Sequence, residues 1–107
     1  MIKANTEVVI LITASSADEA NMLAEKLVEL KLAACVNTTK VNSLFHWQGK
    51  IDKAEETLLI VKSKSELLEE LETIVKKYHS YEVPEIIALP IVAASNNYLK
   101  WINNSVK

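Results

Sequence analysis

Residues 41–62, VNSLFHWQGKIDKAEETLLIVK, decide the fold of this chain. Side chains alternate before the turn, so that Phe45 and Trp47 share one face of a predicted strand. The turn holds Gly49, the only glycine of the chain, and glycine adopts the positive φ that a two-residue hairpin turn requires. The stretch therefore predicts a β-hairpin with one arm over 32–47 and the other over 50–62.

Two helices are predicted on either side of the hairpin, over about 17–30 and about 64–78. Apolar residues recur at helical spacing in both segments. Each segment also begins with a Ser-x-x-Glu pattern, which is typical of a capping box. The predicted caps are Ser16 with Glu19, and Ser63 with Glu66.

The remaining apolar runs predict two outer strands. VVILI at 8–12 is rich in β-branched residues and predicts a strand that is buried on both faces. IIALPIV at 86–92 predicts another strand, and Pro90 favours an edge position or a bulge for it. Ser95 is placed to cap a short terminal helix. The order β-α-β-β-α-β plus a C-terminal helix predicts one α+β domain over residues 1–107, of the ferredoxin-like type, with an antiparallel sheet and a long central hairpin.

The predicted hairpin is longer than the helices that would cover it. Arms of about 13 to 15 residues span roughly 45 Å, whereas helices of about 14 residues span roughly 21 Å. The overhanging tip would carry Phe45, Trp47 and Ile51, and exposed aromatics on open strands favour a partner. We therefore expect a homo-oligomer closed by rotational symmetry. The alternative is a bent hairpin that folds its tip back onto its own sheet.

Composition narrows the classes of partner. The net charge is −2, there are twelve lysines and no arginine, and no basic run exceeds two residues. Nucleic acid and anionic membranes are therefore poor partners, and bidentate recognition of phosphate is disfavoured. The single cysteine excludes a disulfide within the chain and favours a reducing compartment. The apolar runs are too short to span a bilayer, and the N-terminal residues do not resemble a signal peptide, so we expect a cytoplasmic location.

The segment 78–85, YHSYEVPE, is the first candidate site. His79 is a residue type that binds metals or shuttles protons, and Glu85 offers a hard oxygen ligand. The structural interpretation is that His79 ends its helix, Tyr81 packs and Pro84 shapes the turn. One histidine and one glutamate are too few for a closed metal site, which needs three or more ligands.

Other candidates have equally plain structural interpretations. Cys35 lies among apolar neighbours, where a thiol is usually inert. Trp47 is more typical of an interface anchor than of a cofactor stack. Lys62 offers charge to an anion, although solvation at the surface is its default state. No nucleophile–base pattern, glycine-rich phosphate loop, HExxH or CxxC is present, so we do not expect an enzyme.

Together these residues resemble the CutA divalent-cation-tolerance family. The resemblance rests on LAACVN at 32–37, Ser43, Trp47-x-Gly49, Glu56, Lys62 and the H-x-Y-x-x-P-E pattern at 79–85. It implies a cytoplasmic ferredoxin-like homotrimer in which the long hairpins pair between subunits. It further implies a role in tolerance of copper and other divalent ions, and kinship with PII-type signalling trimers that bind small ligands between subunits. The implied intersubunit cleft includes Cys35, Trp47, Lys62, His79, Tyr81 and Glu85.

Two departures from the family pattern bear on metal binding. Ile12 stands where some members have cysteine, and Tyr78 stands where some have a second histidine. Because a thiol and an imidazole are soft copper ligands, we expect no tightly bound cofactor and only weak binding of Cu²⁺ or another divalent cation, with His79 and Glu85 as the candidate ligands. The alternative function is a PII-like sensor of a small molecule, with Lys62 supplying charge. An acyl-phosphate hydrolase would need the missing arginine, and a purely structural oligomer remains a further alternative.

Overall fold

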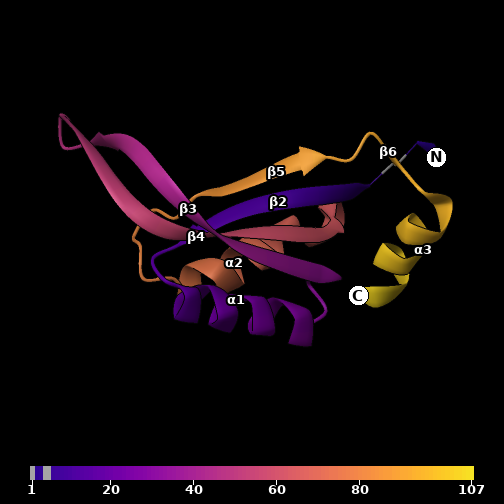
Figure 1. Ribbon diagram of the computed structural model, residues 1–107. Coiled ribbons are helices and arrows are strands. Elements are labelled where there is room, and N and C mark those ends of the chain that lie inside the picture. The colour runs from indigo at the N-terminus through magenta and orange to yellow at the C-terminus, as the bar shows by residue number, and fades with distance from the viewer. Residues whose placement is uncertain (1, 4–5) are drawn as a thin grey trace.

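Strands and helices follow the predicted order β-α-β-β-α-β, with two short additional strands and a terminal helix (Figure 1). The structure is a computed structural model, and it describes residues 2–3 and 6–107. The strands are β1 (Ile2–Lys3), β2 (Glu7–Ala14), β3 (Cys35–Trp47), β4 (Lys50–Lys64), β5 (Ile86–Pro90) and β6 (Ala93–Ala94). The helices are α1 (Ala17–Glu29), a 3₁₀ turn (Ser65–Leu67), α2 (Leu68–Tyr78) and α3 (Asn96–Ser105).

The main sheet is antiparallel with the strand order β3-β4-β2-β5. Both α1 and α2 lie against one face of this sheet (Figure 1). Strand β5 is an edge strand, and Pro90 pairs with Val8 at its end, which confirms the edge position that Pro90 predicts. The core lies between the sheet and the helices, and its fully buried large side chains include Ile10, Ile12, Leu23, Leu27, Leu59, Leu71 and Val75.

Helix α1 begins at the predicted cap. The Ser16 hydroxyl accepts a hydrogen bond from the backbone N–H of Glu19 at 3.1 Å, which satisfies one of the free donors of the first turn. At the other end Lys31 takes a positive φ of 57° and turns the chain back toward the sheet. Strand β3 therefore begins at Cys35, three residues later than predicted, because Leu32 and Ala33 belong to this turn and both bond to the carbonyl of Leu27.

The predicted cap of the second helix is wrong. Ser63 lies inside β4, fully buried, and its hydroxyl donates to the carbonyl of Leu32 at 2.6 Å. The chain stays extended through Lys64, passes through a 3₁₀ turn and enters α2 only at Leu68. The side chain of Ser63 thus joins β4 to the connection before β3 and does not start a helix.

The hairpin turn forms as predicted, and the hairpin extends beyond the rest of the sheet. Gln48 and Gly49 both have positive φ, 48° and 75°, as a type I′ turn requires. Pairing of β4 with β2 ends at Thr57, so among the described residues only β3 accompanies the outer part of β4. These seven residues, 50–56, extend roughly 23 Å. The molecule is accordingly elongated, at 44 × 25 × 22 Å, and the hairpin projects past the helices (Figure 1).

One face of the sheet is left open. In β2 the side chains that face the helices are buried, whereas Val9 and Leu11 on the opposite face are half-buried. The prediction that this strand is buried on both faces therefore holds for only one face within a single chain. The cross-strand register places further apolar side chains on the same open face, namely Val41, Leu58, Ile60, Ile87 and Leu89. Ile87 is 46% exposed and Leu89 is 45% exposed.

The C-terminal helix α3 closes the end of the sheet that lies away from the hairpin. Ser95 caps it as predicted, through a bond from the backbone N–H of Tyr98 at 3.4 Å. Leu99 and Ile102 are buried, and Asn103 donates to the carboxylate of Glu7 at 2.6 Å. None of the helices in the described part of the chain is long and apolar enough to cross a membrane.

Candidate functional site

A cleft of about 760 Å³ lies between the overhanging hairpin and the segment that joins α2 to β5. The hairpin supplies one wall, and residues 81–85 supply the other. The lining residues are Thr13, Ser43, Leu44, Phe45, Trp47, Asp52, Glu56, Tyr81, Glu82, Val83 and Glu85. The cleft exists because β3 and β4 extend past β2, which leaves space beside the last residues of the shorter strand.

His79 fixes the second wall from behind. Its side chain is 0% exposed, its Nε2 lies 2.7 Å from the carbonyl of Thr13, and its Nδ1 accepts the backbone N–H of Tyr81 at 3.0 Å. These partners define a neutral imidazole that donates from Nε2. Both nitrogens are engaged within the chain in this conformation, and the role of His79 as a metal ligand stays a prediction. The structural interpretation of His79 agrees with this geometry.

Glu19 at the start of α1 ties the same segment to the helix layer. Its Oε1 accepts the backbone N–H of Ser15 at 2.8 Å and the hydroxyl of Ser15 at 3.0 Å, and its Oε2 accepts the backbone N–H of Ser80 at 2.8 Å. Partial burial acts to raise the pKa of Glu19, but the hydrogen bonds from Ser15 and Ser80 outweigh it and lower this pKa from 4.5 to about 2. Glu19 is therefore ionised throughout the physiological pH range.

Tyr81 reaches across the cleft from the wall formed by residues 81–85 to the hairpin. Its hydroxyl donates to Glu56 Oε2 at 2.7 Å, and its ring lies 4.9 Å from the ring of His79. Burial, with the hydrogen bond to Glu56 and the negative charges of Glu56 and Glu19, raises the pKa of Tyr81 to about 12. Tyr81 thus stays a neutral donor and holds Glu56 in place.

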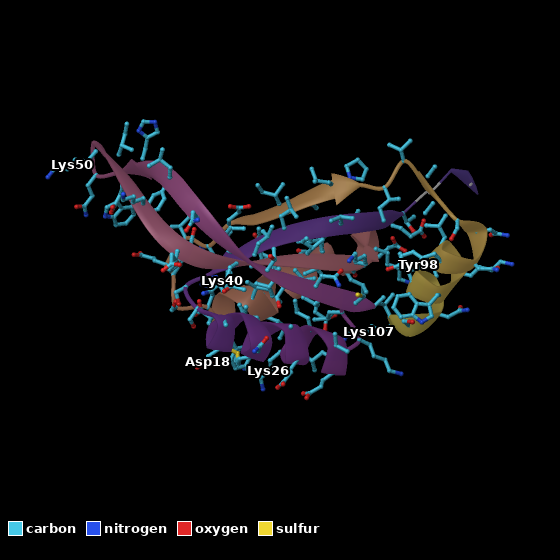
Figure 2. All side chains as sticks on the ribbon, in the orientation of Figure 1. Asp18, Lys26, Lys40, Lys50, Tyr98 and Lys107 are labelled. Atoms are coloured by element: carbon cyan, nitrogen blue, oxygen red, sulfur yellow. The ribbon has the colours of Figure 1, made fainter. Side chains whose placement is uncertain are left out.

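The structure brings three of the six predicted cleft residues together. Trp47, Tyr81 and Glu85 line the cleft, and His79 stands behind it. Cys35 and Lys62 instead pair across β3 and β4 at the other end of the sheet, twelve residues along β3 from Trp47, or roughly 40 Å. Figure 2 shows these two ends, with Lys50 at the hairpin tip and Tyr98 on α3 at the opposite end.

Cys35 and Lys62 form a small polar group on the open face of the sheet. The Lys62 ammonium donates to the side-chain oxygen of Asn37, and the Cys35 sulfur lies 3.9 Å from the same oxygen. Helix α3 packs against β4 and β2 at this end of the sheet. Burial of Tyr98, with an electrostatic contribution from the nearby Cys35, raises the pKa of Tyr98. Within one chain, the residues that the family resemblance assigns to a single cleft are therefore divided between two ends of the sheet.

The charges of the cleft walls have one sign. Asp52, Glu56, Glu82 and Glu85 line it, and no lysine does among the described residues. Yet no three His, Cys, Asp or Glu side chains in the described part of the chain come close enough to hold a metal ion. A single chain therefore does not form a metal cage, although its carboxylate oxygens are of the chemical class that divalent cations accept.

Sequence reasoning did not assign the two carboxylates of the hairpin wall to the cleft. Asp52 pairs with Phe45, and Glu56 pairs with Val41, so both carboxylates share the face of the aromatic residues. This register follows directly from the two-residue turn and the period of two along each strand. The predicted turn alone is therefore enough to place both carboxylates on the same face of the hairpin as Phe45 and Trp47.

Comparison with known proteins supports one family. A family model described as CutA1 divalent ion tolerance protein matches residues 8–105. The divalent-cation tolerance protein CutA of Archaeoglobus fulgidus is 46% identical over 98 residues, which are 92% of this chain and 96% of that protein. The chloroplastic CutA protein of Arabidopsis thaliana is 42% identical over 101 residues, and the match spans 94% of this chain but only 56% of the plant protein's length.

Solved structures agree with the sequence matches. The structure described as the periplasmic divalent cation tolerance protein CutA from Archaeoglobus fulgidus superposes with a TM-score of 0.93 at 44% identity, covering 94% of this chain and 99% of that one. The divalent cation tolerance protein from Thermus thermophilus superposes with a TM-score of 0.92 at 41% identity, with coverage of 94% and 99%. The mixed α+β fold predicted from the sequence is therefore confirmed.

Proposed function

Since this chain belongs to the CutA1 divalent ion tolerance family, we propose that it acts in tolerance of divalent metal ions, copper among them. The role is one of binding, and no catalytic step is assigned to it. We place the protein in the cytoplasm, because its single cysteine fits a reducing compartment. Relatives are described as chloroplastic or periplasmic, so membership of the family does not by itself specify a compartment.

We propose that the protein functions as a homotrimer. The open face of the sheet carries half-buried or exposed apolar side chains on β2, β4 and β5, and no described element covers it. Large exposed apolar faces are uncommon on monomeric proteins. Three copies closed by rotational symmetry would bury this face and shelter the overhanging hairpins.

The single observation that carries the proposal is the division of the cleft residues. Trp47, Tyr81 and Glu85 lie at one end of the open face, whereas Cys35 and Lys62 lie at the other. Head-to-tail packing in a ring brings opposite ends of neighbouring copies together. The ligand site is then complete only between subunits, with the thiol from one copy and the carboxylates from the next.

The metal proposal depends on this arrangement. One chain lacks a convergent ligand set among its described residues, and Ile12 and Tyr78 supply no soft donors where some relatives have them. Glu85 of one copy with Cys35 of another gives a sparse and mixed ligand set. We expect micromolar or weaker binding of Cu²⁺ and no tightly bound cofactor.

Calorimetric titration of the assembled protein with Cu²⁺ and Zn²⁺ tests the proposal. Cys35→Ser and Glu85→Gln should each weaken Cu²⁺ binding by about tenfold, which corresponds to about 1.4 kcal/mol per lost ligand. Glu25→Gln on the exposed face of α1 removes a carboxylate away from the cleft and is the control. If the two cleft variants bind Cu²⁺ as the parent and control do, the proposed metal site is rejected.

The PII-like sensor is the second candidate, and the size of the cleft favours it. Its volume of about 760 Å³ lies in the range of small-molecule sites. Four carboxylates in the walls repel anions, so a nucleotide or an acid is a poor ligand for the cleft of one chain. A sensor of this shape would respond to a neutral or cationic molecule.

A further inference from the structure

The walls of the cleft combine negative charge with exposed aromatic surface. Asp52, Glu56, Glu82 and Glu85 are lining residues, and Trp47 is 58% exposed while facing the same space. Lys50, the basic residue nearest to Trp47 in the hairpin register, lies at the tip and points away from the rest of the molecule (Figure 2). Charge and ring surface together favour a ligand that is both cationic and partly apolar.

The spacing of the carboxylates decides between a metal ion and a longer cation. Asp52 and Glu56 lie four residues apart on the same face of β4, or roughly 13 Å. A divalent ion binds its oxygen ligands within about 2.6 Å, so it cannot bridge these two groups. No three potential metal ligands converge anywhere in the described residues. The negative charge is thus spread along the cleft and not focused at a point.

We propose that the cleft binds an extended aliphatic diamine or polyamine. The terminal ammonium groups pair with carboxylates on opposite walls, those of Asp52 and Glu85 foremost, because Glu56 is already held by Tyr81. The methylene chain lies against Phe45 and Trp47, which offers apolar contact for the stem and a ring face for one ammonium group. This inference rests on the proposed use of the cleft as a ligand site and names the chemical class of its ligand.

Assembly into the proposed ring would add one lysine to the cleft. The neighbouring copy would add Lys62, whose ammonium already donates to Asn37 within its own chain. One lysine does not neutralise four carboxylates. The four carboxylates of the cleft outnumber the one lysine that the proposed packing adds.

Titration with putrescine, butanediol and Mg²⁺ tests whether the cleft recognises the carbon chain of the ligand as well as its charge. Putrescine and Mg²⁺ carry the same charge, whereas butanediol has a carbon chain of equal length without charge. Calorimetry at low ionic strength should show putrescine binding about tenfold or more tightly than either comparator. Quenching of Trp47 fluorescence in a Trp101→Phe background should follow the same order. Equal affinity for putrescine and Mg²⁺ would show that the cleft attracts any divalent cation without recognising the carbon chain, and would overturn the proposal.

Two pairs of substitutions test whether putrescine binds in the cleft. Asp52→Asn with Glu85→Gln should weaken putrescine binding about tenfold, whereas Glu66→Gln with Glu69→Gln removes the same charge beside α2 and should leave it unchanged. Equal losses in both pairs would overturn the assignment to the cleft. Cu²⁺ titration of the parent protein reports on the proposed metal function. A parent that binds putrescine but not Cu²⁺ would reject that function and keep this inference, whereas a parent that binds Cu²⁺ but not putrescine would overturn this inference and keep that function.

Discussion

At the scale of single residues, Glu19 anchors the cleft wall that residues 81–85 form. One carboxylate accepts donors from the end of β2 and from the segment after α2, and so joins two connections that are distant in sequence. His79 extends this link to Thr13 and Tyr81, and Tyr81 extends it to Glu56 on the hairpin. The position of the cleft wall thus depends on a glutamate that does not line the cleft.

The lowered pKa of Glu19 predicts acid sensitivity. In the folded state this pKa is about 2, against 4.5 for the unfolded chain, so the folded state holds fewer protons between these values. The stabilisation from Glu19 is complete above about pH 4.5 and is lost as the pH falls toward about 2. Urea unfolding should show Glu19→Gln to be less stable by about 2 kcal/mol at pH 7.

The pH series also provides the control. The difference in unfolding free energy between the parent and Glu19→Gln should shrink as the pH is lowered from about 5 to about 2.5, because the parent then loses its charge. Glu25→Gln, which alters an exposed carboxylate of the same helix, should remain within about 0.5 kcal/mol of the parent throughout. A constant difference for Glu19→Gln across the series would show that its charge is not the cause.

At the scale of elements, the hairpin turn is the strongest local signal. Gln48 occupies a positive φ of 48°, which non-glycine residues other than asparagine and aspartate seldom adopt. Gly49 follows with a φ of 75°, and a Cβ added there would meet no atom within 4 Å. Any cost of substitution in this turn is therefore a matter of backbone conformation and not of packing.

Replacement of Gln48 tests the conformational argument. Gln48→Asn should raise the free energy of unfolding by about 0.5 kcal/mol, since Asn-Gly is the preferred pair of a type I′ turn. Gln48→Val should lower it by about 1 kcal/mol, because β-branched side chains resist positive φ. Thermal unfolding at one fixed protein concentration measures both changes. Equal melting temperatures for the two variants would show that the turn does not restrain the hairpin.

Local patterns predicted the elements well where one physical cause dominates. The turn, the Ser16 cap and the edge position of Pro90 each depend on the chemistry of one or two residues. The Ser63 prediction failed because Ser-x-x-Glu is the same pattern whether the serine starts a helix or lies in a strand. Two partners distant in sequence hold Ser63 in the strand, namely Val8 across β2 and the carbonyl of Leu32.

At the scale of the whole molecule, the proposed assembly rests on the open face of the sheet. Ile87 and Leu89 remain nearly half exposed although every residue of their strand, β5, is apolar. The cleft residues could not all be placed from sequence, because a long strand carries Cys35 and Trp47 to opposite ends. In the proposed trimer, which of these residues meet would depend on the packing of copies, and no local spacing in the sequence encodes that packing.

A charge on the open face should dissociate the assembly. Ile87→Glu places a carboxylate in the face that the proposed trimer buries, and desolvating it costs several kcal/mol. Sedimentation velocity at micromolar concentration should show the parent near three times the chain mass of 12.0 kDa and the variant near one. Val28→Glu on α1, at a side chain with the same exposure of 46%, should leave the mass unchanged.

Both variants lower the net charge by one, so a general effect of charge would affect them alike. A parent that sediments as a single chain at all concentrations would contradict the trimer outright. Unchanged mass in Ile87→Glu would place the subunit contact elsewhere on the molecule.

The two free edges of the sheet, at β3 and β5, have a further consequence. Contacts that join one end of a copy to the other end of the next are heterologous, and they close only at one angle of rotation between copies. In the proposed trimer, three copies at that angle would pair both of these edges in every copy, and growth would stop. At a slightly different angle the same contacts leave an edge unpaired at each end and build a fibre without limit. A substitution that tilts neighbouring copies would thus convert a finite particle into a filament without weakening a single contact.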